Sequence, residues 1–145
     1  MEMHTVSDEL ERVSKAAEDM NLQVMQALQR LRNSTRHQEM LEALKTMTVI
    51  LGNVLNHPYE KKFSQVRLAN RGFHSRCGRH PAALEILKLA GFRSERDATS
   101  NEDVLRLSRS DPGLLWLIRS CVEGATHSNI QDFTESVASK VSVPS

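Results

Sequence analysis

The sequence predicts one mainly helical domain with a few short strands, an α+β fold. The 145 residues are about the length of a single domain. Only 4% of them are aromatic, so the core has to be built mostly from Leu, Ala, Met and Val, a composition that favours helix packing. Apolar residues also recur at spacings of three and four along several segments, which is the period of a helix with one buried face.

The first helix is expected from about residue 8 to residue 34. Ser7 can cap its start, and Asp8 and Glu9 are placed favourably in its first turn. Its apolar stripe consists of Leu10, Val13, Ala17, Met20, Val24, Leu28 and Leu31. The stripe could be the seam of a coiled coil between two chains, but about three heptads with polar interruptions are more typical of a helix packed on its own domain. We therefore expect a monomer.

Three further helices have clear boundaries. One spans residues 37–56 and stops before a proline, because the residue that precedes proline disfavours helical geometry. The next begins at Pro81 and ends before Gly91. The last is capped by the Asp-Pro pair at residues 111–112 and is expected to end at Gly124.

Short strands fit between these helices. The candidates are Gln65 to Leu68, Phe92 with Arg93, and Val104 to Ser108, of which the last alternates weakly between apolar and polar residues. Residues 125–145 are rich in Ser, Thr and Val. They could form a marginal last helix around residues 130–140 or a disordered tail.

Charge is distributed unevenly along a chain whose net charge is only +1. Residues 61–96 contain nine Lys and Arg against two Asp and Glu, a net charge of +7, whereas residues 1–60 and 97–145 carry −3 each. This basic segment favours an acidic partner. The alternative is a solvated basic face that the acidic flanks neutralise.

Membrane and secreted proteins are not supported by the sequence. The longest charge-free run, residues 46–59, has 14 residues and contains Gly, Asn, His and Pro, whereas a membrane span needs about 20 apolar residues. The N-terminus lacks the basic start and the apolar stretch of a signal peptide. Cys77 and Cys121 alone do not make a disulfide framework, so we expect a reducing compartment, the cytoplasm or the nucleus.

Metal-capable side chains are grouped at His74, Cys77 and His80. A zinc site usually needs four ligands in two pairs, and no second pair with ordinary spacing is present. Arg76 and Arg79 would repel a cation. The same arginines would lower the pKa of the Cys77 thiol, as a nucleophilic cysteine requires, but no Asn or Asp follows to orient a catalytic base. The sequence has no Walker loop, paired-carboxylate motif or Gly-x-Gly-x-x-Gly. We therefore expect no metal, no cofactor and no catalytic residues.

The stretch from residue 53 to residue 92 carries a specific pattern. In order, it contains Asn53, Asn56-His57-Pro58, Glu60-Lys61-Lys62-Phe63, Val66-Arg67-Leu68, Asn70, Phe73 and a helix that ends in Leu89-Ala90-Gly91-Phe92. This order resembles the PUB domain, a family named for its occurrence in peptide N-glycanase and in UBA- or UBX-containing proteins. The family pattern is roughly an Asn on a helix, Asn-x-Pro, Lys-Tyr-x-x-Ile-Arg-x-x-Asn-x-x-Phe, and a helix that ends in Gly-Phe or Gly-Tyr.

The resemblance covers about residues 37–124 and implies a domain organisation. The PUB-like domain would be a mainly helical bundle packed on a small antiparallel sheet of about three strands. Residues 1–36 would be a helix that precedes the domain or packs on it, and residues 125–145 a short helix or a disordered tail.

The resemblance also implies a function. PUB domains are non-catalytic and bind the acidic C-terminal tail of the hexameric AAA ATPase valosin-containing protein, which ends in Leu-Tyr-Gly or something close; an internal acidic tyrosine motif in a deubiquitinase is another known type of ligand. Matched residue by residue, the tail-binding positions are Asn53, Lys62, Phe63, Arg67, Asn70 and Phe73. Phe63 replaces the family's usual Tyr, which keeps the ring but removes a phenolic hydrogen bond worth about 0.5–1.5 kcal/mol.

The residue types at these positions suit such a ligand. The planar guanidinium of Arg67 can stack on a tyrosine ring, and Phe63 and Phe73 can wall the pocket around that ring. Asn53 and Asn70 offer donors and acceptors for a peptide backbone or a terminal carboxylate, and the adjoining lysines would attract acidic residues upstream. Two structural alternatives are open: Phe73 could be a core residue alone, and Asn70 could be only the N-cap of a short helix.

Two alternative functions are also open. Residues 61–96 could bind nucleic acid, with aromatic rings stacked on bases and a steep salt dependence, although the acidic flanks oppose the approach of a long polyanion. The chain could instead be the non-catalytic N-terminal part of a peptide N-glycanase-like protein. Residues 1–145 contain nothing that resembles that enzyme's Cys/His/Asp core, so the chain itself is not expected to be the enzyme. We expect an acidic peptide as the partner, and neither a nucleic acid nor a membrane.

Overall fold

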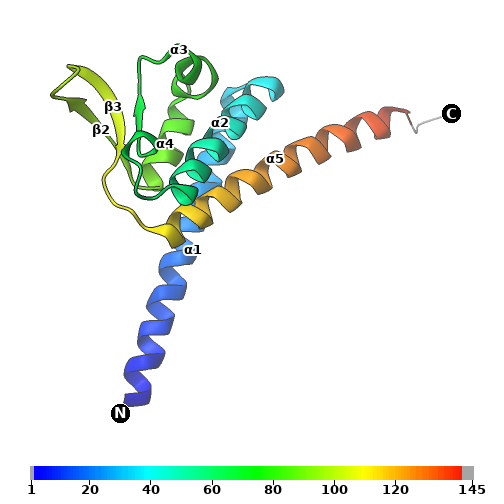
Figure 1. Ribbon diagram of the computed structural model, residues 1–145. Coiled ribbons are helices and arrows are strands. Elements are labelled where there is room, and N and C mark those ends of the chain that lie inside the picture. Colours follow the sequence, from blue (N-terminus) through cyan, green and yellow to red (C-terminus); the bar gives the residue numbers. More distant parts are fainter. Residues whose placement is uncertain (1, 142–145) are drawn as a thin grey trace.

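Helices form most of the molecule, and a small sheet lies at one side of them (Figure 1). The computed structural model describes the backbone of residues 2–141 and the side chains of residues 8–127. The elements are α1 (Glu2–Ser34), α2 (His37–Asn56), the 3₁₀ turn η1 (Lys61–Phe63), β1 (Gln65–Arg67), α3 (Arg71–Phe73), the π-helical turn η2 (His74–Gly78), α4 (Pro81–Leu89), β2 (Phe92–Asp97), β3 (Glu102–Leu107) and α5 (Pro112–Val141). The predicted fold class, mainly helical α+β with a three-stranded antiparallel sheet, is confirmed.

Local sequence signals explain where the helices begin. At α2, Glu39 Oε1 accepts a hydrogen bond from the backbone N–H of Arg36 at 2.9 Å. At α4, Pro81 occupies the first helical position. At α5, Asp111 Oδ1 accepts from the backbone N–H of Leu114 at 3.2 Å, as expected of an N-cap. Both side-chain contacts satisfy N–H groups that the first turn of a helix leaves without an intrahelical partner.

Two helix boundaries differ from the prediction. α1 begins at Glu2 and not near residue 8, so Ser7 lies within the helix and is not its N-cap. α5 does not end at Gly124 but continues to Val141, and its backbone includes residues 130–140, for which the sequence left open a marginal last helix or a disordered tail. A glycine inside a helix costs about 1 kcal/mol relative to alanine, which is not enough by itself to end a helix. The remainder of the predicted tail, residues 142–145, lies outside the described residues.

Gly91 ends α4 for a conformational reason. Its φ angle is +116°, a region that glycine adopts freely and L-residues with a side chain rarely adopt. A Cβ atom here would lie 2.8 Å from the backbone oxygen of Arg109. The carbonyl of Gly91 also accepts a hydrogen bond from the backbone N–H of Ser108 at 3.0 Å. This glycine therefore allows the chain to pass directly from α4 into β2.

The sheet has the strand order β1-β3-β2, and both pairs are antiparallel. Each of the three strand candidates corresponds to one of these strands, although Leu68 and Ser108 lie just outside them and β2 continues beyond Arg93 to Asp97. Arg106, on the central strand, connects both neighbours: its Nη2 donates to Gln65 Oε1 of β1 at 2.9 Å, and its Nη1 donates to Glu95 Oε2 of β2 at 2.7 Å. One arginine thus reinforces the backbone ladder across the whole sheet.

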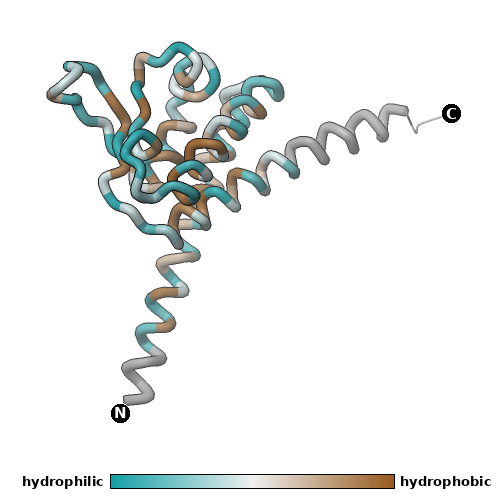
Figure 2. Tube along the Cα trace, in the orientation of Figure 1, coloured by the Kyte–Doolittle hydropathy of each residue, from teal (hydrophilic) through white to brown (hydrophobic). Residues whose placement is uncertain are grey.

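The core lies where the C-terminal part of α1 meets α2, α4 and the first half of α5 (Figure 2). α2 packs mainly on α5, and α1 packs on α4 and α5. The largest fully buried side chains are Leu31, Leu44, Met47, Leu51, Ile86, Leu87, Phe92, Leu105, Leu115 and Ile118. Most of them are aliphatic, as the low aromatic content predicted.

The N-terminal part of α1 extends away from this core (Figure 1). Leu10 and Val13 are 66% and 68% exposed, and only from Val24 onward are stripe residues fully buried. The predicted apolar stripe is therefore a packing face along its C-terminal third alone. Among the described residues, no helix combines the length and the apolar character required to cross a bilayer.

Candidate functional site

One face of α2 runs along the candidate site. Thr46, Ile50 and Asn53 follow one another at intervals of three or four residues, so they share this face, and His57 follows as the C-cap residue of the helix. η1 and η2 pack against α2 near its C-terminal end and its middle. Because α2 is a regular helix anchored on α5, it fixes the spacing between the groups that meet along this face.

An open groove lies between α2 and β1. We call it the α2–β1 groove; it has a volume of about 310 Å³ and is lined by Thr46, Ile50, Gln65, Val66, Arg67, Asn70, Phe73 and Arg76. This volume lies at the lower end of the range of about 300–1,000 Å³ typical of small-molecule sites. Three of the six predicted site residues, Arg67, Asn70 and Phe73, are brought together here.

Arg67 is held by a bidentate ion pair with Glu102 of β3. Its Nε donates to Glu102 Oε2 at 2.7 Å, and its Nη2 donates to Oε1 at 2.9 Å. Such a pair fixes the plane of the guanidinium as well as its position. The side chain of Arg67 is still 57% exposed. Arg67 therefore remains accessible for stacking, although Glu102 balances its charge.

Asn70 is the N-cap of α3, the structural role that the sequence left open. Its Oδ1 accepts a hydrogen bond from the backbone N–H of Phe73 at 3.0 Å. The amide NH₂ group carries two further donors that the cap does not use. Capping and ligand binding therefore employ different atoms of the same side chain.

Phe73 belongs to the core and also contributes to the groove. It is only 5% exposed, and a Cβ atom on Gly78 would lie 2.9 Å from its ring. The ring thus packs closely on the backbone of η2. Phe73 supplies apolar floor to the α2–β1 groove and does not offer an open ring face.

Arg76 lines the groove, although sequence reasoning treated it only as a cation within the His74–His80 segment. It lies in η2, which is a π-helical turn. Such turns are rare in proteins overall, but those that occur are often found at functional sites. A Cβ atom on Gly72 would lie 2.7 Å from Arg76 Nη2 and 3.4 Å from Asn70 Oδ1. The guanidinium therefore fills the space that a glycine leaves beside the capping asparagine.

The other three predicted site residues lie outside the α2–β1 groove. Phe63 stacks on His57, with ring centroids 4.8 Å apart. Lys62 Nζ lies 5.0 Å from the centroid of the Phe63 ring and 3.5 Å from Glu60 Oε2. With Asn53, one helical turn before His57, these residues form a neighbouring cluster at the C-terminal end of α2, which we call the η1 cluster.

The pKa of the Cys77 thiol differs from the prediction. Cys77 is fully buried, and burial raises its pKa to about 12 because the thiolate would lose its hydration. The predicted lowering of this pKa by the neighbouring arginines is therefore wrong.

His74 is exposed whereas His80 is buried, and among the described side chains no three His, Cys, Asp or Glu residues come together as metal ligands.

Acidic side chains from outside residues 61–96 pair with much of the basic segment. Four such ion pairs are Lys62–Glu60, Arg67–Glu102, Arg79–Glu39 and Arg96–Asp103. The positive charge is thus partly neutralised by the flanks, as the sequence alternative proposed. Within the described residues, Arg76 has neither an ion pair nor a side-chain hydrogen bond.

A small helical domain that presents arginine, amide and apolar groups in one open groove has the architecture of a protein-interaction domain. The comparison with protein families makes this assignment specific. The model of the PUB domain matches residues 37–120, and the chain belongs to the PUB domain family. PUB domains are non-catalytic modules that bind protein partners. A comparison with curated proteins returned no matching sequence.

Proposed function

We propose that this PUB domain binds the acidic, aromatic-ending C-terminal tail of the AAA ATPase valosin-containing protein. In this role the chain acts as an adaptor in ubiquitin-dependent protein quality control, in the cytoplasm or the nucleus. The observation that carries the proposal is the α2–β1 groove, in which Arg67, Asn70 and Phe73, three positions of the family pattern, line one open surface.

The chemistry of this groove fits an aromatic residue close to a free C-terminus. Glu102 holds the edge of the Arg67 guanidinium, so a face of the guanidinium is available to stack on a tyrosine ring, an interaction worth about 0.5–2 kcal/mol. The free NH₂ group of Asn70 can donate to a backbone carbonyl or to the terminal carboxylate. Ile50 and Val66 supply apolar walls.

The η1 cluster suits the acidic part of such a tail. Lys62 is 73% exposed and carries a positive charge near the end of α2, where it can attract acidic residues. The ammonium group of this lysine lies over the ring of Phe63, which has no hydroxyl group to bond the peptide. We expect a total affinity on the order of micromolar, about −8 kcal/mol, which the six tails of a hexameric partner would strengthen.

A nucleic acid is a less suitable ligand for the same basic segment. Ion pairs with Glu39, Glu60, Glu102 and Asp103 reduce the positive field that a polyanion would require. The only aromatic side chain of the groove, Phe73, is buried and cannot stack on a base. Both observations favour a short acidic peptide.

Isothermal titration with a ten-residue tail peptide tests the proposal. Wild type is expected to bind a peptide with a free C-terminus at a Kd on the order of micromolar, and Arg67→Ala to weaken binding by about tenfold or more. Arg93→Ala is the matched control, because Arg93 is an exposed arginine of β2, at the opposite edge of the sheet. An absence of heat with hundreds of micromolar wild-type protein would contradict the proposal, and steeply salt-dependent binding of generic oligonucleotides would support the alternative.

A further inference from the structure

The apolar side of α1 follows a strict heptad spacing. Alternating steps of three and four residues lead along the helix, and every position of the series is apolar: Leu10, Val13, Ala17, Met20, Val24, Ala27 and Leu31. Such spacing places all of these side chains along one seam, as at the a and d positions of a coiled coil. The seam is therefore continuous over more than half of α1.

The domain covers only the C-terminal part of this seam. The seam residues from Val24 onward are fully buried, and Met20 is partly buried against the core. Leu10 and Val13 are instead mostly exposed. We call residues 8–20 the α1 arm, which extends away from the body of the molecule (Figure 1). The seam of the α1 arm thus has no partner among the described residues.

One flank of the α1 arm is acidic. Glu11, Ser14 and Glu18 follow one another at intervals of three and four residues beside the seam, and all three are exposed. Neither glutamate forms an ion pair or a side-chain hydrogen bond with another side chain that the structure describes. Residues 8–20 contain five Asp and Glu against two Lys and Arg, a net charge of −3. Because Ser14 is small, a long basic side chain of a partner can reach both carboxylates.

We infer that the α1 arm is a docking surface for one amphipathic helix of a second protein, a helix with a row of aliphatic residues and a flank rich in Lys or Arg. The aliphatic row lies over Leu10 and Val13, and the basic flank lies against Glu11 and Glu18. A second copy of this chain is a poor occupant, because it brings the same negative charge to the interface. The α1 arm is separate from the α2–β1 groove, so this inference does not depend on the proposed tail ligand.

The α1 arm is already helical before a partner arrives. It continues a helix that is anchored by its buried part, so binding does not have to nucleate a helix in this chain. At 1.5 Å per residue the arm is about 20 Å long, or nearly two heptads. In the sequence, the same spacing continues back to Val6 and Met3. An interface of this size favours moderate affinity, with a Kd on the order of 10–100 micromolar.

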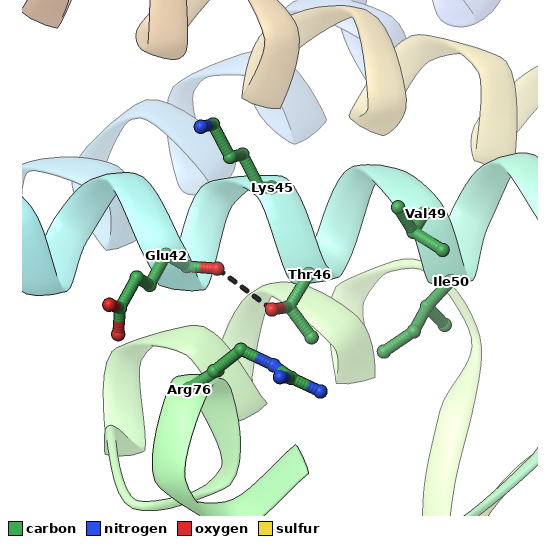
Figure 3. Close-up of a pocket in the computed structure, with 6 residues that line it drawn as sticks. All are labelled: Glu42, Lys45, Thr46, Val49, Ile50 and Arg76. Atoms are coloured by element: carbon green, nitrogen blue, oxygen red, sulfur yellow. Dashed lines mark hydrogen bonds between the residues drawn. The ribbon is translucent and has the colours of Figure 1, made fainter. Parts of the chain in front are cut away.

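Two variants separate the apolar and the charged part of the surface. Val13→Ser removes an apolar contact and retains the helix, because valine and serine have similar helix propensities. The double variant Glu11→Gln/Glu18→Gln removes the charges of the flank. The matched controls are Val49→Ser and Glu42→Gln on α2 (Figure 3). Val49 is 60% exposed, comparable with the 68% of Val13, but lies outside the α1 arm.

The experiment titrates the full chain into three fluorescently labelled 21-residue helical peptides and follows their anisotropy. The basic peptide has Leu at the a and d positions of three heptads and Lys at the flanking e and g positions, which also oppose its self-association. The acidic peptide has Glu at e and g, and the polar peptide retains the lysines but has Ser at the a positions.

We expect wild type to bind the basic peptide with a Kd on the order of 10–100 micromolar and the other two at least about tenfold more weakly. Val13→Ser should weaken binding of the basic peptide about fivefold or more. The double glutamine variant should weaken it about two- to fivefold. Val49→Ser and Glu42→Gln should bind it as wild type does.

Several results would contradict the inference. They are no binding of the basic peptide at hundreds of micromolar protein, equal binding of the basic and acidic peptides, and wild-type affinity in Val13→Ser. Light scattering of the chain alone provides a further test, because a dimer that Val13→Ser dissociates would assign the seam to a second copy. Circular dichroism of each variant checks that a loss of binding does not arise from a loss of helix.

Discussion

At the scale of single residues, Asn70 illustrates how one side chain serves the fold and the ligand. Its Oδ1 caps α3 by accepting from the N–H of Phe73. Its NH₂ group is available to a peptide. A substitution can therefore separate the two roles, because serine retains an oxygen acceptor for the cap and has no amide NH₂ group.

We predict that Asn70→Ser lowers the affinity for the tail peptide at least about fivefold and leaves the melting temperature close to that of wild type. Asn70→Ala should lower both, because loss of an N-cap costs about 0.5–2 kcal/mol, or a few degrees in a protein of this size. Titration calorimetry and thermal denaturation measure the two effects. Wild-type affinity in both variants would show that Asn70 is a cap and nothing more.

The residues of the α2–β1 groove were predictable from sequence only in part. Arg67, Asn70 and Phe73 belong to a motif with fixed spacing, and a short strand followed by a capped turn brings them together. Arg76 could not be identified, because its position depends on the π-helical turn and on the space above Gly72, and neither has a sequence signature of its own. The stacking of Phe63 on His57 was equally hidden, since it depends on how η1 folds back on α2.

At the scale of elements, α1 consists of two parts that differ in burial. Residues 8–19 are exposed, whereas Val24, Ala27, Leu28 and Leu31 are buried against α4 and α5. The periodic stripe runs through both parts, because periodicity reports which side of a helix is apolar and not how far its packing partners extend. The same limit applies to α5, where Gly124 was taken as an end signal but lies inside the helix.

Truncation of α1 tests this division. We expect deletion of residues 1–18 to leave the melting temperature nearly unchanged, whereas Leu31→Ala should destabilise the domain by about 2–5 kcal/mol because it removes a fully buried side chain. Thermal and urea denaturation measure both variants. Stabilisation of the domain by residues 1–18 would overturn this division.

Gel filtration with light scattering of the full chain tests the predicted monomer, and an elution at twice the monomer mass would instead indicate pairing through the exposed stripe.

At the scale of the whole molecule, buried and paired ionisable groups couple stability to pH. Burial lowers the pKa of His80 below its usual 6.5, and the charge of Arg79 acts in the same direction. The pKa of Glu39 is lowered chiefly by the hydrogen bond from the Arg36 backbone. The unfolded chain therefore binds protons more readily than the folded chain, first at His80 and then at Glu39.

We predict that stability decreases as the pH falls below about 6.5 and decreases further as it falls below about 4.5, the ordinary pKa of a glutamate. His80→Leu removes the first group and should flatten the stability curve immediately below pH 6.5. Arg93→Leu, on the exposed surface, should not change its shape. Urea denaturation between pH 4 and pH 8 provides the measurement. An unchanged slope in His80→Leu would show that this histidine does not control the acid response.

The central claim is that an acidic, aromatic-ending peptide binds in the α2–β1 groove. A titration of ¹⁵N-labelled protein with the tail peptide, followed by two-dimensional NMR, tests it most directly because it reports both binding and location. We predict saturable shifts at Ile50, Val66 and Arg67 and at the side-chain NH₂ group of Asn70, and none in the turn between β2 and β3. The absence of shifts, or shifts confined to that turn, would contradict the claim.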